Sequence, residues 1–387
     1  MQLSLSFVTG LTVAGAALAA PVPSSPANES FFQVALSKRN VNLHKANSFV
    51  IDTSKVAAHV SSIRAKYAQT LSNLESDGIA KREVSKIPLV AQQGGSFWSG
   101  TVQFGDQALT VDFDTGSSDV VINEGAYKPS SNSTKTSKTF LNRYGTASST
   151  TEVSGTVYQD SFSSGPIKAS KASVGLITSG GEVIDGADGL IGLAYPAISN
   201  YGPGLPPLFD ALISQNAVSS KTFSFALSTD SSELTLGGID SSKYSGSITY
   251  TPVSRKAYWQ VPATVNGQPF SSIVDSGTTL VIADTNTGSA QRFFKQLGVE
   301  TFQQGGDLYG EVDCDKPPKI TFDYGGKKIT LSKESAILGK TNTGTCALTI
   351  IGTSVGQSAW ITGDPVFLNS YVVFDRENDR VGFADRS

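Results

Sequence analysis

The stretch Phe113-Asp114-Thr115-Gly116-Ser117-Ser118 decides how this chain folds. Apolar residues lead into it from Leu109 and resume at 120–122, so the pattern predicts a strand that carries Asp114 into a tight turn. Gly116 allows the backbone to pass close to another group or to take an unusual φ. One such motif is a weak signal in a chain rich in Ser, Thr and Gly. Asp114 is followed by three residues whose hydroxyl groups can donate hydrogen bonds to its carboxylate, Thr115, Ser117 and Ser118.

A second copy of the motif follows at residues 273–281, Ile-Val-Asp-Ser-Gly-Thr-Thr-Leu-Val. The offset is 161 residues, from 114 to 275, and no other Asp-Ser/Thr-Gly occurs in the chain. The repeat predicts that Asp114 and Asp275 form a pair of carboxylates. The residues expected to support the pair are Thr115, Gly116, Ser117, Ser276, Gly277 and Thr278.

The repeat extends beyond the two motifs. Asp188-Gly189-Leu190-Ile191-Gly192-Leu193 follows the first motif, and Trp360-Ile361-Thr362-Gly363-Asp364 follows the second at a similar distance. Each segment supplies a glycine that could pack against an Asp-bearing loop. Two halves of similar design predict a pseudo-twofold arrangement in which the carboxylates meet at the seam.

Composition favours an all-β protein with two lobes. The 387 residues exceed a typical single core, charged residues make up 16%, and there are 38 glycines. A net charge of −3 gives no indication of nucleic-acid binding. Apolar spacing predicts short helices at 207–215 and 288–297. The polar stretch 129–138 is expected to be a solvated loop, and within it Asn132 begins an Asn-Ser-Thr glycosylation signal.

Residues 1–20 are expected to be a secretory signal peptide. The run is uncharged, apolar and ends in small residues, although its first residues lack a basic side chain. A membrane anchor is the alternative, which the prolines at 21 and 23 disfavour. The last residues, 382–387, carry no apolar tail. We therefore expect a secreted protein, extracellular rather than vacuolar, with no membrane association.

Residues 21–82 are expected to be a propeptide that leaves 83–387 as the mature chain. Residues 54–77 have the apolar spacing of an amphipathic helix with Ser54 as N-cap, and Lys81-Arg82 is a dibasic pair. Of the chain's 30 basic and 33 acidic residues, this segment holds eight and four, so it is near +4 and the remainder near −7. We expect charge and the helix to hold it on the body. An ordinary N-terminal helix is the alternative.

The two histidines, His44 and His59, both lie in this segment. A mature chain without histidine cannot use Ser-His-Asp or Cys-His catalysis or bind a metal through imidazole, so acid–base chemistry is left to carboxylates. Cys314 and Cys346 fit one disulfide in an oxidising compartment, with two buried thiols as the alternative.

From Trp98 to Ala384 the chain resembles the pepsin-like aspartic endopeptidases, most closely the secreted fungal ones of polyporopepsin type. The matching pieces are Phe113–Ser118, Tyr144-Gly145-Thr146, Asp188–Pro196, Leu236–Asp240, Tyr258-Trp259-Gln260, Ile273–Leu280, the pair Cys314/Cys346, Val373–Arg376 and Val381–Phe383. The resemblance implies a bilobal all-β fold over 98–384, with lobes at about 83–226 and 227–387 and a cleft between them.

The resemblance also implies that Asp114 and Asp275 are catalytic and that Tyr144, Gly145 and Thr146 form a flap over the substrate. Val121 stands where the family commonly has a Trp that hydrogen-bonds the flap tyrosine, so Tyr144 is expected to be held differently. Thr146 stands where some fungal members of the family have an acidic residue that would favour Lys at the cut. Because Thr146 is neutral, we expect cleavage between bulky apolar residues rather than after Lys.

The expected activity is hydrolysis of peptide bonds at acid pH. One carboxylate would act as general base on a water while its protonated partner stabilises the oxyanion. This chemistry needs no cofactor and no metal, and the protein is expected to act as a monomer on polypeptides. The alternatives are an inactive member of the same fold that binds or inhibits, and a calcium-binding or structural β-protein. No regular run of Asp ligands supports calcium binding.

Overall fold

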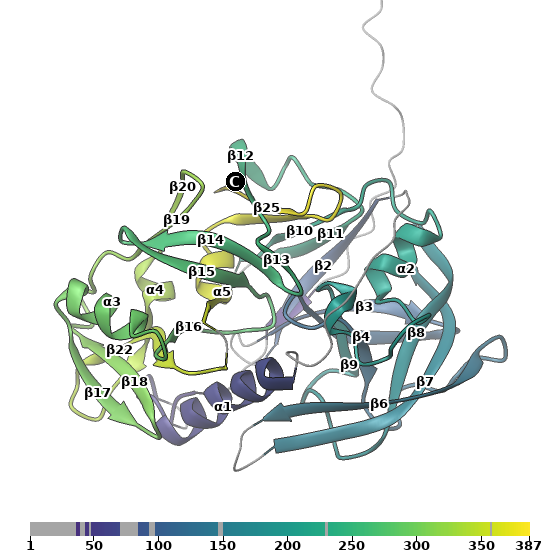
Figure 1. Ribbon diagram of the computed structural model, residues 1–387, viewed down its shortest axis with the longest axis horizontal. Helices are drawn as coiled ribbons and strands as arrows, with labels where there is room; N and C mark the ends of the chain where they lie inside the picture. Colours follow the sequence, from purple (N-terminus) through teal and green to yellow (C-terminus); the bar gives the residue numbers. More distant parts are fainter. Residues whose placement is uncertain are drawn as a thin grey trace, which may run out of the picture. The chain divides into compact units, whose positions relative to one another are not determined.

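The computed structural model describes residues 36–38, 43–45, 48–69, 84–92, 97–145, 150–228, 231–356 and 358–387 (Figure 1). All of them belong to one compact unit, Phe31–Ser387. The expected signal peptide, the dibasic pair at 81–82 and Thr146 lie outside the described residues. Strands dominate the described chain, as the composition predicts.

The described strands form two large sheets. The first contains, in spatial order, β12 (Tyr244–Pro252), β25 (Arg380–Arg386), β24 (Tyr371–Asp375), β10 (Thr222–Ala226), β11 (Ser232–Leu236), β2 (Ser85–Gln92), β1 (Leu36–Lys38), β3 (Phe97–Phe104), β4 (Gln107–Asp114), β9 (Gly189–Gly192), β5 (Val120–Ile122), β8 (Ile167–Ser179), β7 (Thr150–Ser164) and β6 (Thr134–Gly145).

The second sheet contains β17 (Glu300–Gln304), β18 (Asp307–Val312), β22 (Cys346–Thr353), β16 (Val281–Asp284), β23 (Trp360–Thr362), β15 (Gln268–Val274), β14 (Trp259–Val265), β19 (Thr321–Tyr324) and β20 (Lys327–Thr330), with β13 (Arg255–Lys256) on β14 and β21 (Ile337–Lys340) on β22. The helices of the described chain are short except for the first: α1 (Thr53–Gln69), the 3-10 helix η2 (Pro196–Ile198), α2 (Leu208–Ser214), α3 (Ser289–Leu297), α4 (Lys333–Ala336) and α5 (Asp364–Phe367).

The two Asp-bearing strands sit in equivalent positions in the two sheets. β4 pairs in parallel with β9, which sets Asp114 opposite Gly192, and β15 pairs in parallel with β23. The amide of Leu193 donates to the Asp114 carbonyl at 2.8 Å, and the amide of Asp275 donates to the Thr362 carbonyl at 3.1 Å. The predicted packing of 188–193 and 360–364 against the Asp loops, and the pseudo-twofold, are therefore confirmed.

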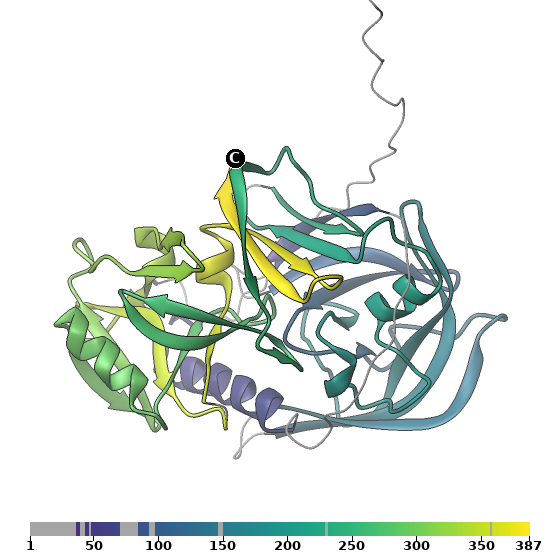
Figure 2. The ribbon, with the colours of Figure 1, turned by 45° about the horizontal axis from the view of Figure 1, so that its top comes forward.

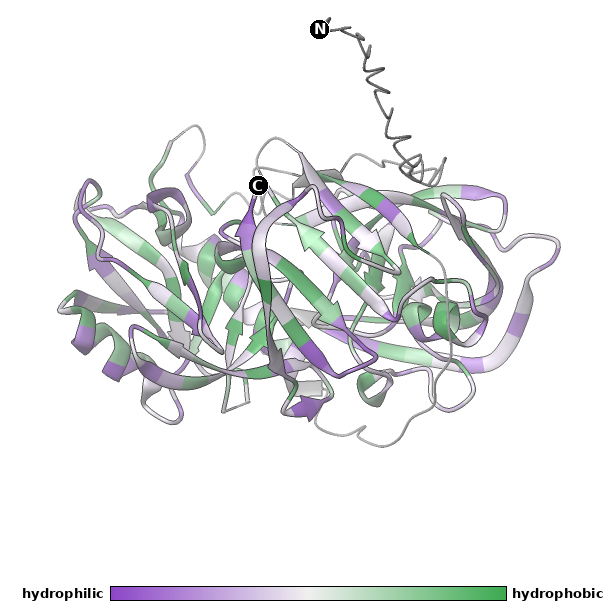
Figure 3. Cartoon of the chain, turned by 90° about the horizontal axis from the view of Figure 1, so that it is seen from above, coloured by the Kyte–Doolittle hydropathy of each residue, from purple (hydrophilic) through white to green (hydrophobic). Residues whose placement is uncertain are grey.

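The main core joins the two sheets. In Figure 3 apolar and polar residues alternate along several strands, as expected for strands that are buried on one face. Trp98 in the first sheet donates its indole N–H to Asp364 of α5 at 2.9 Å, and Trp259 in the second donates to the Leu193 carbonyl at 3.0 Å. Both indoles are fully buried, so each supplies apolar contact and satisfies its one polar atom across the seam.

Helix α1 lies along the second sheet beside β16 and β18, with its C-terminal end toward β6 (Figures 1 and 2). Its predicted apolar stripe is buried and packs in one cluster with Tyr258, Ile282, Tyr309 and Ile351 of the body. The described members of the stripe are Val56, Val60, Ile63 and Tyr67, and its last two predicted members, Leu71 and Leu74, lie outside the described residues.

The predicted N-cap of this helix is wrong by two positions. The carboxylate of Asp52, not the Ser54 hydroxyl, accepts from the amides of Ser54 at 3.1 Å and Lys55 at 3.3 Å. A carboxylate satisfies the free amides of a first helical turn and also interacts well with the positive end of the helix dipole. The helix is described as far as Gln69, and residues 70–77 of the prediction lie outside the described residues.

The prediction of a solvated loop at 129–138 is wrong from Thr134 onward, where β6 begins. The backbone pairs with β7, Thr134 opposite Gln159, while the side chains at 134 and 135 are exposed. A strand exposed on both faces has no apolar alternation by which a sequence could reveal it. The predicted short helices are confirmed as α2 and α3.

Cys314 and Cys346 form a disulfide, with their Cα atoms 5.0 Å apart. The bond joins the start of β22 to the segment that follows β18. In the chain-entropy model a loop of 32 residues gives a stabilisation of about 3–4 kcal/mol.

Candidate active site

The two Asp-bearing loops are held together by a reciprocal set of hydrogen bonds. The amide of Thr115 donates to Ser276 Oγ at 3.1 Å, and the amide of Ser276 donates to Thr115 Oγ1 at 2.9 Å. Each hydroxyl then donates across the seam, Thr115 to the Val274 carbonyl at 3.0 Å and Ser276 to the Phe113 carbonyl at 2.7 Å. The middle residue of each motif therefore joins the loops and leaves the aspartates free to face one another.

Each carboxylate receives two hydrogen bonds from its own loop. Gly116 donates its amide to Asp114 Oδ1 at 2.8 Å and Ser117 donates its hydroxyl to Oδ2 at 2.5 Å. Asp275 receives the equivalent bonds, from the Gly277 amide at 3.0 Å and the Thr278 hydroxyl at 2.5 Å.

Each motif glycine is required by the other loop. A Cβ atom at Gly116 would collide with the Asp275 carboxylate, and one at Gly277 would collide with the Asp114 carboxylate. The two carboxylates can approach only because these positions have no side chain.

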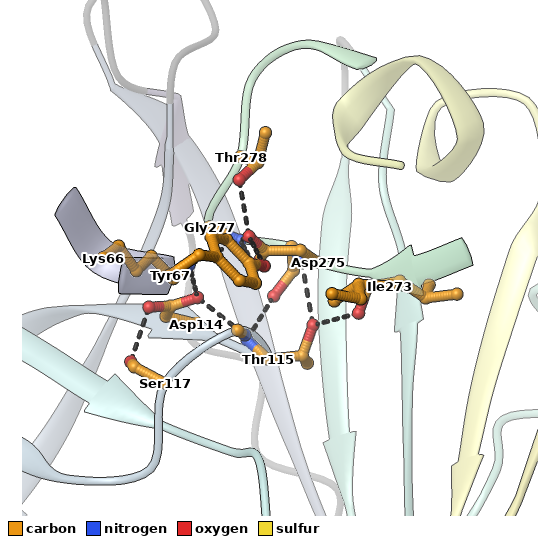
Figure 4. Close-up of polar contacts among 12 residues, drawn as sticks. Lys66, Tyr67, Asp114, Thr115, Ser117, Ile273, Asp275, Gly277 and Thr278 are labelled. Carbon is orange, nitrogen blue, oxygen red and sulfur yellow. Dashed lines mark hydrogen bonds and ion pairs between the residues drawn. The ribbon is translucent and has the colours of Figure 1, made fainter. Parts of the chain in front are cut away.

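Two side chains of α1 reach the Asp pair (Figure 4). Lys66 Nζ lies 2.7 Å from Asp114 Oδ1 and 2.9 Å from Asp275 Oδ2. The hydroxyl of Tyr67 donates to Asp275 Oδ2 at 2.8 Å, and its ring packs on Tyr258 with centroids 4.8 Å apart. A single ammonium group thus lies between both carboxylates, and the aromatic ring beside it excludes water.

The environment separates the two carboxyl groups. Burial raises the pKa of Asp114, the neighbouring Asp275 raises it further, and the Lys66 charge only partly opposes this. Burial also acts to raise the pKa of Asp275, but Lys66 and the hydrogen bonds from Asp114 and Thr278 outweigh it and the pKa is lowered. Burial would lower the pKa of Lys66, yet the two carboxylates raise it, so the ammonium stays charged. Because the carboxyls are coupled, they titrate as a pair.

The expected flap region is described only in part. Gly145 ends β6, the side chain of Tyr144 is not described, and Thr146 lies outside the described residues. Two residues before Tyr144, the buried Asn142 accepts from Asn200 Nδ2 at 2.7 Å. Val121 is fully buried and packs in a separate apolar cluster with Phe140 and Tyr201.

Sequence reasoning missed three groups at or near this site. The polar roles of Lys66 and of the Tyr67 hydroxyl were not predicted, although Tyr67 was expected on the buried face of the helix. The third is Asp119, a buried carboxyl that accepts from Ser199 Oγ at 2.5 Å and the Asn200 amide at 2.7 Å. For Lys66 and Tyr67, the signal available in the sequence was a basic residue directly beside the aromatic residue of the apolar stripe.

Comparison with known proteins identifies this architecture. The eukaryotic aspartyl protease family matches residues 98–386. The chain belongs to that family. It is 32% identical to secreted aspartyl protease 1 of Malassezia globosa over the whole of both chains. It is 33% identical to an aspartic protease of Phaffia rhodozyma, over 95% of this chain and 94% of the relative.

More distant relatives share the same design. Human cathepsin D is 32% identical over 89% of this aspartyl protease and 93% of its own length. Among solved structures, the aspartic proteinase of Irpex lacteus has the same fold, with a TM-score of 0.67 over 79% of this chain and 98% of that one, at 24% identity. This aspartyl protease is thus an aspartic-type endopeptidase that hydrolyses polypeptides. Among its described residues, no helix is long and apolar enough to cross a membrane.

Proposed function

We propose that this protein is a secreted acid endopeptidase, made as a zymogen, in which Asp114 and Asp275 form the catalytic dyad. The observation that carries the proposal is the contact of one ammonium group, Lys66 Nζ, with both carboxylates. Two buried carboxylates that bind one cation at 2.7 and 2.9 Å also have the spacing to bind one water and one proton between them.

The reaction follows from the opposite protonation states of the pair. The ionised carboxylate removes a proton from the bound water, which attacks the scissile carbonyl. The protonated carboxyl donates a hydrogen bond to the carbonyl oxygen and stabilises the charge that develops there. The amides of Gly116 and Gly277 and the hydroxyls of Ser117 and Thr278 hold both groups in orientation. A flap that includes Tyr144 closes over the substrate.

Helix α1 acts as the inhibitory segment in this scheme. Lys66 occupies the place of the water and proton, and Tyr67 fills the adjoining space against Tyr258. The pKa of Asp275 is lowered here, so its ion pair with Lys66 is present at and above the ordinary Asp value and is lost as the pH falls through the lowered pKa. Acid also protonates other carboxylates of the body and weakens its attraction for the basic segment 21–82. Cleavage after Arg82 then releases the mature chain.

The surface beneath α1 supports a preference for bulky apolar residues around the cut. Side chains of Tyr258, Leu280, Ile282 and Ile361 pack in the same cluster as the apolar stripe of α1. Removal of the helix would leave this apolar surface for a substrate. Asn132 is exposed before β6, which suits its proposed glycosylation. Secretion is supported by the apolar run 1–20 and by the relative from Malassezia globosa, which is named a secreted protease.

The test is hydrolysis of a denatured protein at acid pH by the secreted product. Wild-type enzyme should be active and inhibited by a transition-state mimic of peptide hydrolysis. Asp114→Asn and Asp275→Asn should each lower turnover by about 10²-fold or more, with the fold retained by circular dichroism. Asp106→Asn, which neutralises an exposed carboxylate in the turn between β3 and β4, is the matched control. Retention of wild-type turnover by either dyad variant would show that the assignment is wrong.

A further inference from the structure

Helix α1 makes a second buried ionic contact with the body, away from the Asp pair. Arg64 donates from Nη2 to Asp307 Oδ1 and to Thr353 Oγ1, and from Nε to the Ser354 carbonyl at 3.0 Å. A guanidinium group offers its donors in a planar fork, and here the fork meets a carboxylate, a hydroxyl and a carbonyl at once.

The receiving pocket is built by the body and not by the helix. Asp307 opens β18 directly after the tight turn from β17, and Thr353 ends β22. The register of these strands, Leu308 opposite Gly352, brings the two side chains to the same edge of the sheet. The relative exposure of Asp307 is 0% and that of Thr353 is 1%.

The pocket is incomplete without a cation. Among the described residues, Arg64 supplies the one ion pair of Asp307, and Asp307 Oδ2 is buried with no hydrogen-bond partner. Burial raises the pKa of this carboxyl, against the Thr353 hydrogen bond and the Arg64 charge. Departure of α1 would remove the cation that pairs with Asp307 in the precursor and would uncover its carboxylate, which another cation could then bind.

The position of the pocket relative to the Asp pair follows from the helix. Arg64 precedes Tyr67 by three residues, which is about 4.5 Å along the axis of an α-helix. A substrate that lies extended over the same surface advances about 3.3 Å per residue. Because arginine side chains are long, the pocket is within reach of a residue roughly two to four positions from the scissile bond.

We propose that Asp307, Thr353 and the Ser354 carbonyl form a substrate subsite for a basic side chain, preferably arginine, two to four residues from the cut. This rests on the function proposed above, in which α1 leaves the mature enzyme. Arg64 occupies the subsite in the precursor as Lys66 occupies the Asp pair. The subsite acts in addition to the apolar preference at the cut itself. Arginine is favoured over lysine because only its fork reaches all three acceptors together.

The first experiment uses mature wild-type enzyme and peptides with one fixed apolar cleavage site. Arg, Gln or Glu is placed in turn at each position from the second to the fourth on either side of the cut. We expect kcat/KM for Arg to exceed that for Gln by about tenfold at one position, with Glu below Gln. Equal values for the three residues at every position would overturn the subsite. Failure to cut even the Gln peptides would instead contradict the proposed function.

The second experiment assigns the preference to the pocket. At the selected position, the Arg-to-Gln ratio of kcat/KM should fall to about one in Asp307→Asn. Glu311→Gln is the matched control, since it neutralises another carboxylate of β18 that is instead bonded to Thr343 and Thr345. It should keep the wild-type ratio. A ratio that survives Asp307→Asn, or that is lost equally in both variants, would show that the pocket only anchors the precursor segment.

Discussion

The two Asp-bearing loops are nearly identical in geometry and differ in what surrounds them. Both place a carboxylate between the amide of a glycine and a hydroxyl, at distances that agree within 0.2 Å, 2.8 against 3.0 Å and 2.5 in both. The middle residues, Thr115 and Ser276, exchange amide–hydroxyl bonds in both directions. The repeated residues therefore determine the positions of the carboxylates.

The segment α1 breaks this symmetry. Lys66 contacts Oδ1 of Asp114, the oxygen that also accepts from the Gly116 amide. At Asp275 it contacts Oδ2, the oxygen that also accepts from the Thr278 hydroxyl. The Tyr67 hydroxyl donates to Asp275 Oδ2. The pKa of Asp114 is raised, chiefly by burial, and that of Asp275 is lowered because Lys66 and the hydrogen bonds from Asp114 and Thr278 outweigh its burial. Lys66 and Tyr67, which lie outside the repeat, thus contact the two carboxylates unequally.

The repeat itself breaks at Asp119, whose counterpart 161 residues later is Leu280. Both side chains are buried, but Asp119 accepts from Ser199 and from Asn200, whose side chain donates to Asn142 on the strand that leads to Tyr144. Leu280 instead packs in the apolar cluster under α1. Hydrogen bonds through Asn200 thus connect the N-terminal loop to the strand that precedes the expected flap.

The largest effect is expected from Lys66→Met in the full-length precursor. Removal of one partner of a buried ion pair leaves the other charges uncompensated, at a loss of about 3–5 kcal/mol. We expect the uncleaved precursor to hydrolyse peptides about 10²-fold faster than wild type at pH 6, measured at early times with chain mass followed in parallel.

Lys55→Met is the matched control for this change. Lys55 belongs to the same helix, but its side chain is 45% exposed, forms an ion pair with Asp52 at 3.9 Å and donates to the His44 carbonyl at 3.3 Å. It should leave the precursor inactive. Equal activity of the two variants would mean that loss of helix stability, and not of the contact with the dyad, opens the site.

The next effect concerns stability and pH at Asp119. Burial raises its pKa to about 6, against the hydrogen bonds from Ser199 and Asn200. The native state therefore binds this proton more tightly than the unfolded chain, whose Asp pKa is about 3.8. Stability falls as the pH rises from about 4 to 6, and the loss is complete above that, at about 3 kcal/mol.

Asp119→Asn should flatten this dependence, measured as the free energy of unfolding in urea between pH 4 and 7. Asp106→Asn, an exposed site, should keep the wild-type slope. If Asp119→Asn followed the wild-type curve as Asp106→Asn does, the prediction would be wrong. Asp119 would then titrate as a solvated carboxyl does, and its difference from Leu280 would not affect stability.

The parts of the fold and of the site that could be predicted from the sequence are those that depend on a local pattern of residues. An apolar run that ends in Asp-Thr-Gly, repeated once, predicts two strands, two turns and two carboxylates at a seam, and the structure has them in equivalent parallel pairs. The helices α2 and α3 begin and end near the predicted residues because apolar spacing and glycine are local signals. The disulfide pairing followed from there being only two cysteines.

Contacts between residues far apart in the chain could not be predicted in this way. Lys66 lies 48 residues from Asp114 and 209 from Asp275, and the helical period shows which face is apolar but not which polar side chain meets which partner. Arg64 meets Asp307 across 243 residues. The N-terminal part of β6 was missed because its exposed polar side chains resemble those of a loop.

The smallest effect separates the contribution of the body from that of α1. Without the helix, the two loops offer their carboxylates the same donors. Ser117→Ala and Thr278→Val each remove a hydroxyl that donates to a carboxyl of the dyad and favours its ionised form, so each change raises the pKa of the carboxyl concerned. In the mature enzyme both variants should therefore shift the acidic limb of kcat/KM upward by similar amounts, about one pH unit.

In the precursor the same two variants should differ. Thr278 donates to Asp275 Oδ2, the oxygen that also accepts from Lys66 and Tyr67. Ser117 donates to Asp114 Oδ2, whereas Lys66 contacts the other oxygen of that carboxylate, Oδ1. Loss of the Thr278 hydroxyl makes Asp275 easier to protonate and so weakens its ion pair with Lys66. Thr278→Val should raise the pH at which the precursor becomes active, and Ser117→Ala should change it less. Unequal shifts in the mature enzyme would show that the body alone distinguishes the two carboxylates, and equal shifts in the precursor would show that α1 does not.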